Sequence, residues 1–141
     1  MSDEPIRPFH LAFPIKNLKE TELWYTKILG CIVGRQSDKW IDFNFFGHQI
    51  VGHLVKNIGQ AQANEVDNNN IPSRHFGIIL KIEEWKKLVN HLESKNIKFE
   101  IKPHARFKDK TGEQHTMFIK DPSGNFLEFK AFKNDQNIFQ R

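Results

Sequence analysis

Four side chains occupy positions from which a folded chain could hold a metal ion or move a proton. Each lies in a short run dominated by apolar residues, which is the pattern of a strand; they are His10, His53, His75 and Glu128. A carboxylate within such a run must be paired, bound to a metal or exposed, because burying an unpaired charge is costly. What these side chains do therefore depends on which strands face one another.

The sequence around Glu128 indicates a turn followed by a strand. Residues 121–124 are Asp-Pro-Ser-Gly, in which proline presets φ at the second turn position and glycine accepts the positive φ that closes the turn. In a strand over 125–132, Leu127 and Phe129 share one face and Glu128 lies on the other, since side chains alternate. Glu128 is thus predicted to point away from the apolar face of its strand.

Along the chain, the hydrophobic spacing predicts one succession of elements twice: a strand, a helix and three strands. The first succession has a strand at 9–15, a helix from 17 or 19 to 29, and strands near 31–34, 40–46 and 49–55. The second has a strand at 74–81, a helix at 83–95, and strands at 98–102, 115–120 and 125–132. Gly30 and Asn96 are expected to end the two helices in the left-handed conformation.

Between the two successions lies a polar stretch, 56–72, whose Asp-Asn-Asn-Asn run at 67–70 favours an irregular loop. We therefore predict a single α+β domain built from two βαβββ modules. Module one covers about 8–57, a linker 58–72, and module two about 73–133.

The side chains that could bind a metal recur at matching places in this repeat. His10 and His75 fall in the first strands of the two modules. His53 and Glu128 fall in the last strands. Each module therefore offers one such residue in its first strand and one in its last.

Composition narrows the classes of function. The chain has 141 residues, 38% of them hydrophobic, which suffices for one sizeable core. Its net charge of +4 comes from scattered lysines that alternate with acidic residues. A nucleic-acid surface gathers basic residues on one face, so we expect no nucleic-acid partner.

The single cysteine, Cys31, excludes an intramolecular disulfide, and no run approaches the ~20 apolar residues of a membrane span. We predict a cytoplasmic protein without a membrane partner.

In several stretches the chain resembles the vicinal oxygen chelate superfamily, which includes glyoxalase I, bleomycin-resistance proteins, extradiol dioxygenases, fosfomycin-resistance enzymes and methylmalonyl-CoA epimerase. The similar stretches are Phe9 to Ala12, Trp24 to Cys31, His75 to Gly77 and Asp121 to Glu128, within roughly 8–133. The resemblance implies that the two modules pair and that their mixed β-sheet curls into a cleft for one divalent metal. It also implies a homodimer and a small-molecule substrate with two neighbouring oxygens.

By this resemblance, the metal ligands would be His10, His75 and Glu128. Two imidazoles and one carboxylate on one side of a metal are typical of non-haem Fe(II) sites that bind substrate and dioxygen together. Fe(II) is therefore favoured, with Zn, Ni or Mn as alternatives. His53 stands at a position that the family uses variably. It is either a fourth ligand or a general base, and both roles stay open.

Three further side chains are candidates for substrate contact. Arg106 lies in a long polar stretch, and a guanidinium binds a carboxylate or phosphate through two parallel hydrogen bonds. Asn44 shares a strand face with Asp42 and would meet a ligand if that face lines the cleft. Phe118 stands where extradiol dioxygenases resemble one another in carrying tyrosine, which counts against catechol cleavage.

These expectations favour a metal-dependent enzyme, first of all an extradiol-dioxygenase-like oxygenase. One alternative is a glyoxalase-type lyase or isomerase, in which the metal polarises an enediolate and no oxygen is consumed. Against a standard glyoxalase I stands His53, which replaces the glutamate of that enzyme's proton shuttle. The second alternative is a non-catalytic binding protein similar to bleomycin-resistance proteins, a class that typically lacks the ligand set.

Overall fold

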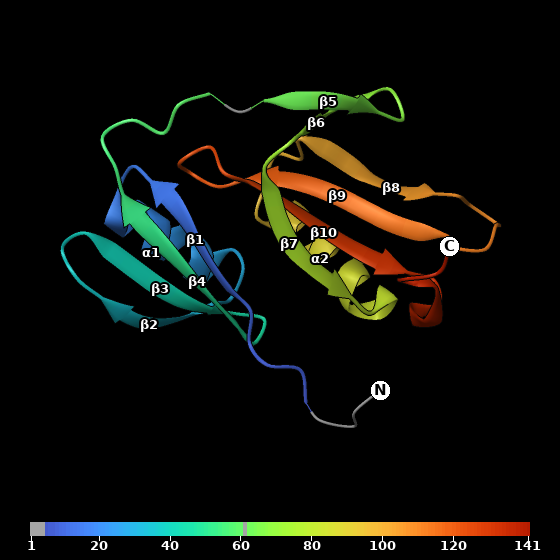
Figure 1. Ribbon diagram of the computed structural model, residues 1–141, viewed down its shortest axis with the longest axis horizontal. Helices are drawn as coiled ribbons and strands as arrows, with labels where there is room; N and C mark the ends of the chain where they lie inside the picture. Colours follow the sequence, from blue (N-terminus) through green and yellow to red (C-terminus); the bar gives the residue numbers. More distant parts are fainter. Residues whose placement is uncertain (1–4, 61) are drawn as a thin grey trace. The chain divides into compact units, whose positions relative to one another are not determined.

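The computed structural model describes residues 5–60 and 62–141 and divides into two compact units, Met1–Gly59 and Gln60–Arg141. Figure 1 shows the strands and helices of each unit. In the described residues, each unit has a four-stranded sheet and one α-helix, and the second unit adds a two-stranded sheet. The predicted α+β class with a repeated βαβββ module is confirmed. Neither of the α-helices in these residues has the length and apolarity that crossing a membrane requires.

The first unit follows the predicted succession. Its elements are β1 His10–Ile15, α1 Leu18–Lys27, β2 Ile32–Gln36, β3 Trp40–Phe45 and β4 His48–Leu54. The strands are ordered β1-β4-β3-β2, with β1 parallel to β4 and the other pairs antiparallel. Phe46 and Gly47, with φ of 50° and 89°, form the tight turn that joins β3 to β4.

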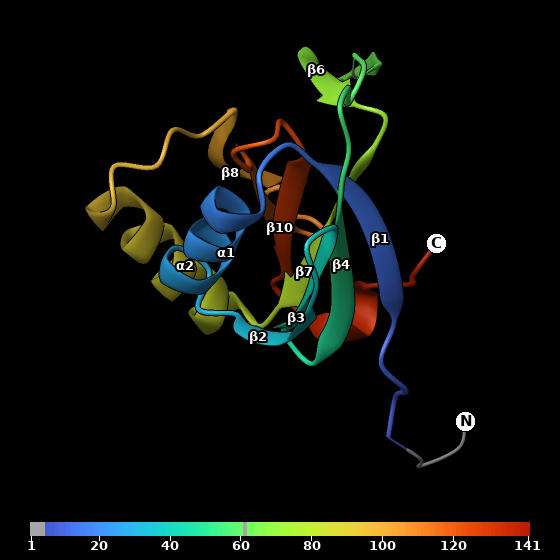
Figure 2. The same ribbon diagram turned by 90° about the vertical axis from the view of Figure 1, so that its left-hand side faces the viewer.

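The core of the first unit lies between α1 and one face of its sheet (Figure 2). Phe13, Ile41 and Phe43 are buried on that face. The fully buried Tyr25 of α1 stacks on Phe43, with ring centroids 5.0 Å apart. His10 is exposed on the opposite face of β1, as the alternation of apolar and polar residues predicts.

The second unit repeats this arrangement. Its corresponding elements are β7 His75–Leu80, α2 Ile82–Ser94, β8 Ile101–Arg106, β9 Gln114–Lys120 and β10 Phe126–Phe132, followed by a 3-10 helix, Asp135–Asn137. The strand order β7-β10-β9-β8 matches that of the first sheet, and β7 and β10 are the parallel pair. The first and last strands of each module are therefore neighbours.

The helix α2 covers the core face of the second sheet. Trp85, Val89 and Leu92 are buried at helical spacing. The indole Nε1 of Trp85 donates a hydrogen bond of 2.8 Å to the carbonyl oxygen of Phe129 in β10. This bond ties the helix to the strand residue that follows Glu128.

Residues at the helix ends behave as predicted. Gly30 and Asn96, with φ of 71° and 55°, both adopt the left-handed conformation after their helices. Cys31 is buried, and burial raises the pKa of its thiol to about 12. The thiol therefore stays protonated, in agreement with the interpretation of Cys31 as a small core residue.

The loop predicted for 56–72 is wrong in its second half. Ala63–Val66 and Asn69–Pro72 form the antiparallel strands β5 and β6. Asp67 and Asn68 connect them, with φ of 51° and 65°. Two consecutive positive φ values are typical of the type I′ hairpin turn, and Asp and Asn tolerate them. The run that suggested irregularity thus encodes a hairpin.

The strand predicted at 98–102 is also displaced. The observed strand β8 is Ile101–Arg106 and extends into the stretch that was expected to be a polar loop. Its pairing with β9 shifts in register between Ile101 and His104. Pairing along β9 outweighs the low strand propensity of these polar residues, so local composition misplaced the strand. Arg106 consequently stands at the end of a strand.

Candidate metal and substrate site

His75 and Glu128 meet on the face of the second sheet that is opposite α2, here called the open face. In the parallel pair β7–β10, His75 is paired with Phe126, and Glu128 lies two residues farther along on the same face. The Nε2 atom of His75 lies 3.0 Å from Oε2 of Glu128. Two of the three predicted metal ligands are therefore in direct contact.

The backbone fixes which nitrogen of His75 points at Glu128. The Nδ1 atom of His75 lies 2.7 Å from the carbonyl oxygen of Pro72, which can only accept, so Nδ1 carries a hydrogen. The ring is also held by an edge-on contact with Phe118, with ring centroids 5.0 Å apart. Because Nε2 then faces a carboxylate, the hydrogen bond to Glu128 raises the pKa of His75, although burial opposes the shift.

Glu128 is held by its neighbours as an ionised carboxylate. Burial acts to raise its pKa, but the hydrogen bonds from His75 and Thr116 and the charge of Lys130 outweigh burial, and the pKa lies below its usual value. The Oγ1 atom of Thr116 donates to Oε1 at 2.8 Å. The Nζ atom of Lys130 lies 3.8 Å from the same oxygen. The second oxygen, Oε2, is the one that faces His75.

This pair of donors fits a divalent cation. A metal-bound histidine usually donates its other ring N–H to a backbone carbonyl, as His75 does to Pro72, and ligating carboxylates are themselves hydrogen-bonded, as Glu128 is by Thr116. Within the described ranges, no three side chains of His, Cys, Asp or Glu gather into one group. His75 and Glu128 are the two predicted ligands that the second unit brings into contact, and their binding of a metal stays a prediction.

Gly77 explains how closely the two strands approach at this site. It pairs with Glu128, and a Cβ placed on it would lie 1.6 Å from the Glu128 carbonyl oxygen. Since this neighbour is backbone, any larger residue would have to push β7 away from β10. The His-Phe-Gly sequence at 75–77 therefore combines a predicted ligand with the glycine that lets β7 approach β10 closely.

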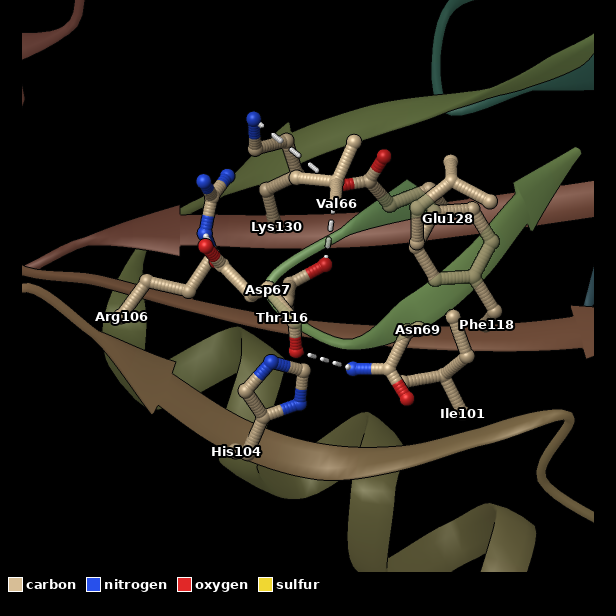
Figure 3. A pocket seen from close by; sticks show the side chains of 11 residues that line it. Val66, Asp67, Asn69, Ile101, His104, Arg106, Thr116, Phe118, Glu128 and Lys130 are labelled. Atoms are coloured by element: carbon tan, nitrogen blue, oxygen red, sulfur yellow. Dashed lines mark hydrogen bonds and ion pairs between the residues drawn. The ribbon is translucent and has the colours of Figure 1, made fainter. Parts of the chain in front are cut away.

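A pocket opens beside Glu128 on the same face (Figure 3). It has a volume of about 160 Å³ and is lined by Val66, Asp67, Asn69, Ile71, Ile101, His104, Arg106, Thr116, Phe118, Glu128 and Lys130. This volume is small beside the roughly 300–1,000 Å³ of drug-sized ligand sites, so the pocket suits a small molecule. The hairpin β5–β6 supplies four of the lining residues.

Charged side chains occupy one side of this pocket. The Nε atom of Arg106 lies 2.6 Å from Oδ2 of Asp67, at the tip of the hairpin. Lys130 approaches from β10. Sequence reasoning proposed Arg106 but missed Asp67, His104, Thr116 and Lys130. Lys130 could have been found, because it shares a strand face with Glu128; Asp67 could not, because the hairpin was not predicted.

Phe118 lies where cross-strand pairing puts it against the site. It is the β9 partner of Glu128, is 2% exposed and lines the pocket. Its ring supplies an apolar wall next to the carboxylate. Contact of Phe118 and Arg106 with a substrate stays a prediction.

In the first unit, the register separates His10 from His53. His10 is paired with Gln49, and its Nδ1 lies 2.8 Å from Oε1 of that residue. His53 is paired with Pro14, four residues along the same face. At about 3.3 Å per residue this is a separation of roughly 13 Å along the strands. Gln49, which sequence reasoning missed, is the polar side chain directly opposite His10.

Asn44 has a structural task in the first unit. Its Oδ1 accepts a hydrogen bond of 2.8 Å from the backbone N–H of Gly47 and so closes the β3–β4 turn. The neighbouring Asp42 is buried and accepts hydrogen bonds from the backbone N–H of Arg35 and, at 3.1 Å, from Gln49 Nε2. Contact of Asn44 with a substrate stays a prediction.

Known proteins are similar to this chain over nearly its whole length. The family model described as the Glyoxalase/Bleomycin resistance protein/Dioxygenase superfamily matches residues 7–129. The solved glyoxalase/bleomycin resistance protein/dioxygenase from Alicyclobacillus acidocaldarius is 32% identical, with 98% of this chain and 100% of that chain covered and a TM-score of 0.80.

Two more distant solved structures share the fold. The genomically encoded fosfomycin resistance protein from Listeria monocytogenes is 13% identical, with 95% of this chain and 98% of that chain covered and a TM-score of 0.70. The lactoylglutathione lyase from Agrobacterium tumefaciens is 16% identical, with 90% and 94% covered and a TM-score of 0.66. At such identities the similarity concerns the fold alone. The search of curated proteins found no match.

Proposed function

Because this chain belongs to the glyoxalase/bleomycin resistance protein/dioxygenase superfamily, we propose that it is a metal-dependent enzyme acting on a small substrate with two neighbouring oxygens. The observation that carries the proposal is the contact of His75 Nε2 with Glu128 Oε2 at 3.0 Å. These are a nitrogen and an oxygen donor on adjacent strands, each oriented by a further hydrogen bond. An oxygenase similar to the extradiol dioxygenases is the first candidate.

A divalent cation bound by His75 and Glu128 would polarise the substrate oxygens as a Lewis acid. The chain's own residues then have separate tasks. Thr116 and the Pro72 carbonyl orient the two ligands. Phe118 is buried beside Glu128 and limits access of water to it.

The remaining ligands are proposed from the family resemblance. His10 belongs to the other unit, and its role as third ligand stays a prediction. Two histidines and one carboxylate would favour Fe(II), with Zn, Ni or Mn as alternatives. His53 is proposed as a general base or as a fourth ligand. The roughly 13 Å between His53 and the level of His10 in the first sheet counts against a bond of both side chains to the same ion.

A specific observation favours a second candidate, a glyoxalase-type lyase or isomerase. Phe118 has no hydroxyl group, and its ring lies against His75 at the site. The tyrosine that extradiol dioxygenases carry there is therefore missing. Lyase or isomerase chemistry requires proton transfer at the substrate carbon and no dioxygen. A non-catalytic binding protein would need no metal at all.

Elemental mass spectrometry of untagged protein purified without oxygen separates these candidates. Near-stoichiometric iron, with oxygen uptake on addition of a vicinal-oxygen substrate, would support the oxygenase. Zinc, nickel or manganese without oxygen uptake would support the lyase or isomerase. Protein that contains no metal and takes none up on reconstitution would contradict both.

We expect the native protein to be a homodimer in the same preparation, as sedimentation would measure.

A further inference from the structure

Cross-strand pairing arranges the open face of the second unit in rows. Glu128, Phe118 and Ile101 form one row across β10, β9 and β8, and the next row is Lys130, Thr116 and His104. Beyond it, Arg106 is paired with Gln114. Consecutive rows lie about 7 Å apart along β9 and β10, where they differ by two residues. Along β8 the first two rows differ by three residues, because the register shifts between Ile101 and His104. The basic side chains therefore stand on one side of Glu128.

The pocket is divided in the same way. Figure 3 shows the ammonium group of Lys130 and the guanidinium group of Arg106 on one side, and the side chains of Phe118 and Ile101 on the other. An occupant would thus place apolar atoms against the Phe118 side and polar atoms toward the two cations.

The formal charges of the acidic and basic side chains that line the pocket cancel as long as no metal is bound. Asp67 and Glu128 then match Arg106 and Lys130. A divalent cation bound by Glu128 would add two positive charges to the pocket. An anionic group on the ligand would offset part of this excess through charge-assisted hydrogen bonds.

The carboxylate of Asp67 pairs with the guanidinium of Arg106, as the anionic group of a substrate could. Its Oδ2 lies 2.6 Å from Nε of Arg106, and it reaches the pocket from the tip of the β5–β6 hairpin. The guanidinium has further N–H donors in the same plane, so it can bind a second oxyanion beside Asp67 or exchange Asp67 for it. The contact shows that the guanidinium of Arg106 is placed to pair with a carboxylate at this end of the pocket.

We infer that the substrate carries an anionic group, a carboxylate or a phosphonate, which Arg106 and Lys130 bind while Asp67 competes for Arg106. The inference rests on the proposed function, since the two neighbouring oxygens of the same substrate would approach His75 and Glu128. The pocket is thereby assigned a metal end and an anion end. Asp67 sets the selectivity of the anion end. An anion that binds Arg106 too weakly to displace the Asp67 carboxylate is repelled by that carboxylate.

The test compares two probes of similar size and shape, the anion 3,4-dihydroxybenzoate and the neutral 3,4-dihydroxybenzamide, by calorimetric titration of the Zn²⁺-loaded chain. Zn²⁺ is chosen because it undergoes no redox chemistry with the diol. A charge-assisted hydrogen bond predicts that the benzoate binds at least about tenfold more tightly. 3,4-Dihydroxyphenylphosphonate is titrated in parallel, and the tighter of the two anions identifies the class.

Variants of Arg106 and Asp67 test whether these residues cause the preference for benzoate. Arg106→Gln should reduce the preference for benzoate over benzamide several-fold, since it removes one of the two cations proposed to bind the anion. Asp67→Asn should raise the affinity for benzoate several-fold while leaving that for benzamide unchanged, a gain that general loosening of the hairpin would not produce. Lys120→Gln is the matched control, because Lys120 is on the same sheet but outside the pocket.

The two proposals fail in different ways. Equal affinities for benzoate, phosphonate and benzamide in a chain that binds Zn²⁺ would overturn the anion end and leave the metal proposal standing. A chain that takes up no metal, yet prefers the benzoate through Arg106, would support the anion end and contradict the metal-dependent enzyme. Loss of benzoate affinity in Asp67→Asn would overturn the competition assigned to Asp67.

Discussion

His75 and Glu128 approach within 3.0 Å across the parallel pair β7–β10, although they are far apart in the sequence. Three features of the fold produce this approach. Gly77 lets the strands close up, Trp85 ties α2 to the carbonyl next to Glu128, and Pro72 holds the ring of His75. The contact is therefore a consequence of the backbone as well as of two suitable side chains.

Thr116→Val should weaken metal binding without disturbing the sheet. The substitution keeps the shape of the side chain but removes the hydroxyl that donates to Glu128 Oε1 at 2.8 Å. Loss of such an outer hydrogen bond typically lowers metal affinity by about 10–100-fold. Calorimetric titration with Zn²⁺ measures the change, and Thr111→Val in an exposed loop is the control. Equal affinities in both variants would show that Thr116 does not orient a ligand.

Gly77→Ala should be strongly destabilising and should also reduce metal affinity. The new Cβ would meet the backbone of Glu128, so β7 must move away from β10. Overpacking of this kind costs about 1–3 kcal/mol or more of unfolding free energy. Gly52→Ala is a matched control in the equivalent strand pair of the first unit, where the Cβ would meet only the side chain of Ile15 at 3.0 Å. Urea denaturation of both variants tests the difference, and a smaller loss in Gly77→Ala would contradict it.

His10→Ala tests the ligand that the family resemblance assigns to the first unit. Loss of a residue that only hydrogen-bonds to a ligand already lowers metal affinity by about tenfold or more. Loss of a direct ligand should lower the Zn²⁺ affinity by at least as much. His91→Ala, on an exposed position of α2, is the control. If His10→Ala binds Zn²⁺ as the unsubstituted protein does, His10 is not a ligand.

Glu113 should make stability depend on pH. Its carboxylate accepts from the backbone N–H of Asp109 at 2.7 Å, which lowers its pKa, and Lys133 and His115 add to the effect. Because the folded pKa lies below the ordinary value of 4.5, the stabilisation is present above pH 4.5 and is lost as the pH falls through the folded pKa. Glu113→Gln should therefore be less stable than the unsubstituted protein at pH 7, and the difference should shrink in acid.

Urea midpoints measured from pH 7 downward test this dependence. Glu65→Gln, which removes an exposed carboxylate, is the control and should show a smaller difference at every pH. A difference between Glu113→Gln and the unsubstituted protein that stays constant with pH would mean that ionisation of Glu113 does not contribute to folding.

Alternation along the strands was enough to predict the repeat and the faces of its strands. Leu127 and Phe129 are buried under α2 while Glu128 lies on the open face, as period-two alternation requires. The helix ends at Gly30 and Asn96 followed from residue types that tolerate positive φ. These features depend on local chemistry, which the sequence displays directly.

Features that depend on register and on turn chemistry escaped prediction. The hairpin tip at Asp67 and Asn68 requires two successive left-handed residues, and a polar run does not distinguish such a turn from a loop. Pairing of His10 with Gln49 depends on the register of β1 against β4, which alternation leaves free in steps of two residues. The contact of Arg106 with Asp67 depends on the hairpin and on the shifted register of β8 against β9, so neither partner could be placed from the sequence alone.

The most direct test of the proposed metal site is a Zn²⁺ titration of metal-free protein, repeated with Glu128→Ala and His75→Ala. Both side chains lie on the open face, so we expect folded variants, which circular dichroism verifies. The unsubstituted chain should bind about one equivalent tightly, as one cation per site requires, and both variants should lose this binding. If both variants bind Zn²⁺ with unchanged stoichiometry and affinity, the site at His75 and Glu128 is not a metal site.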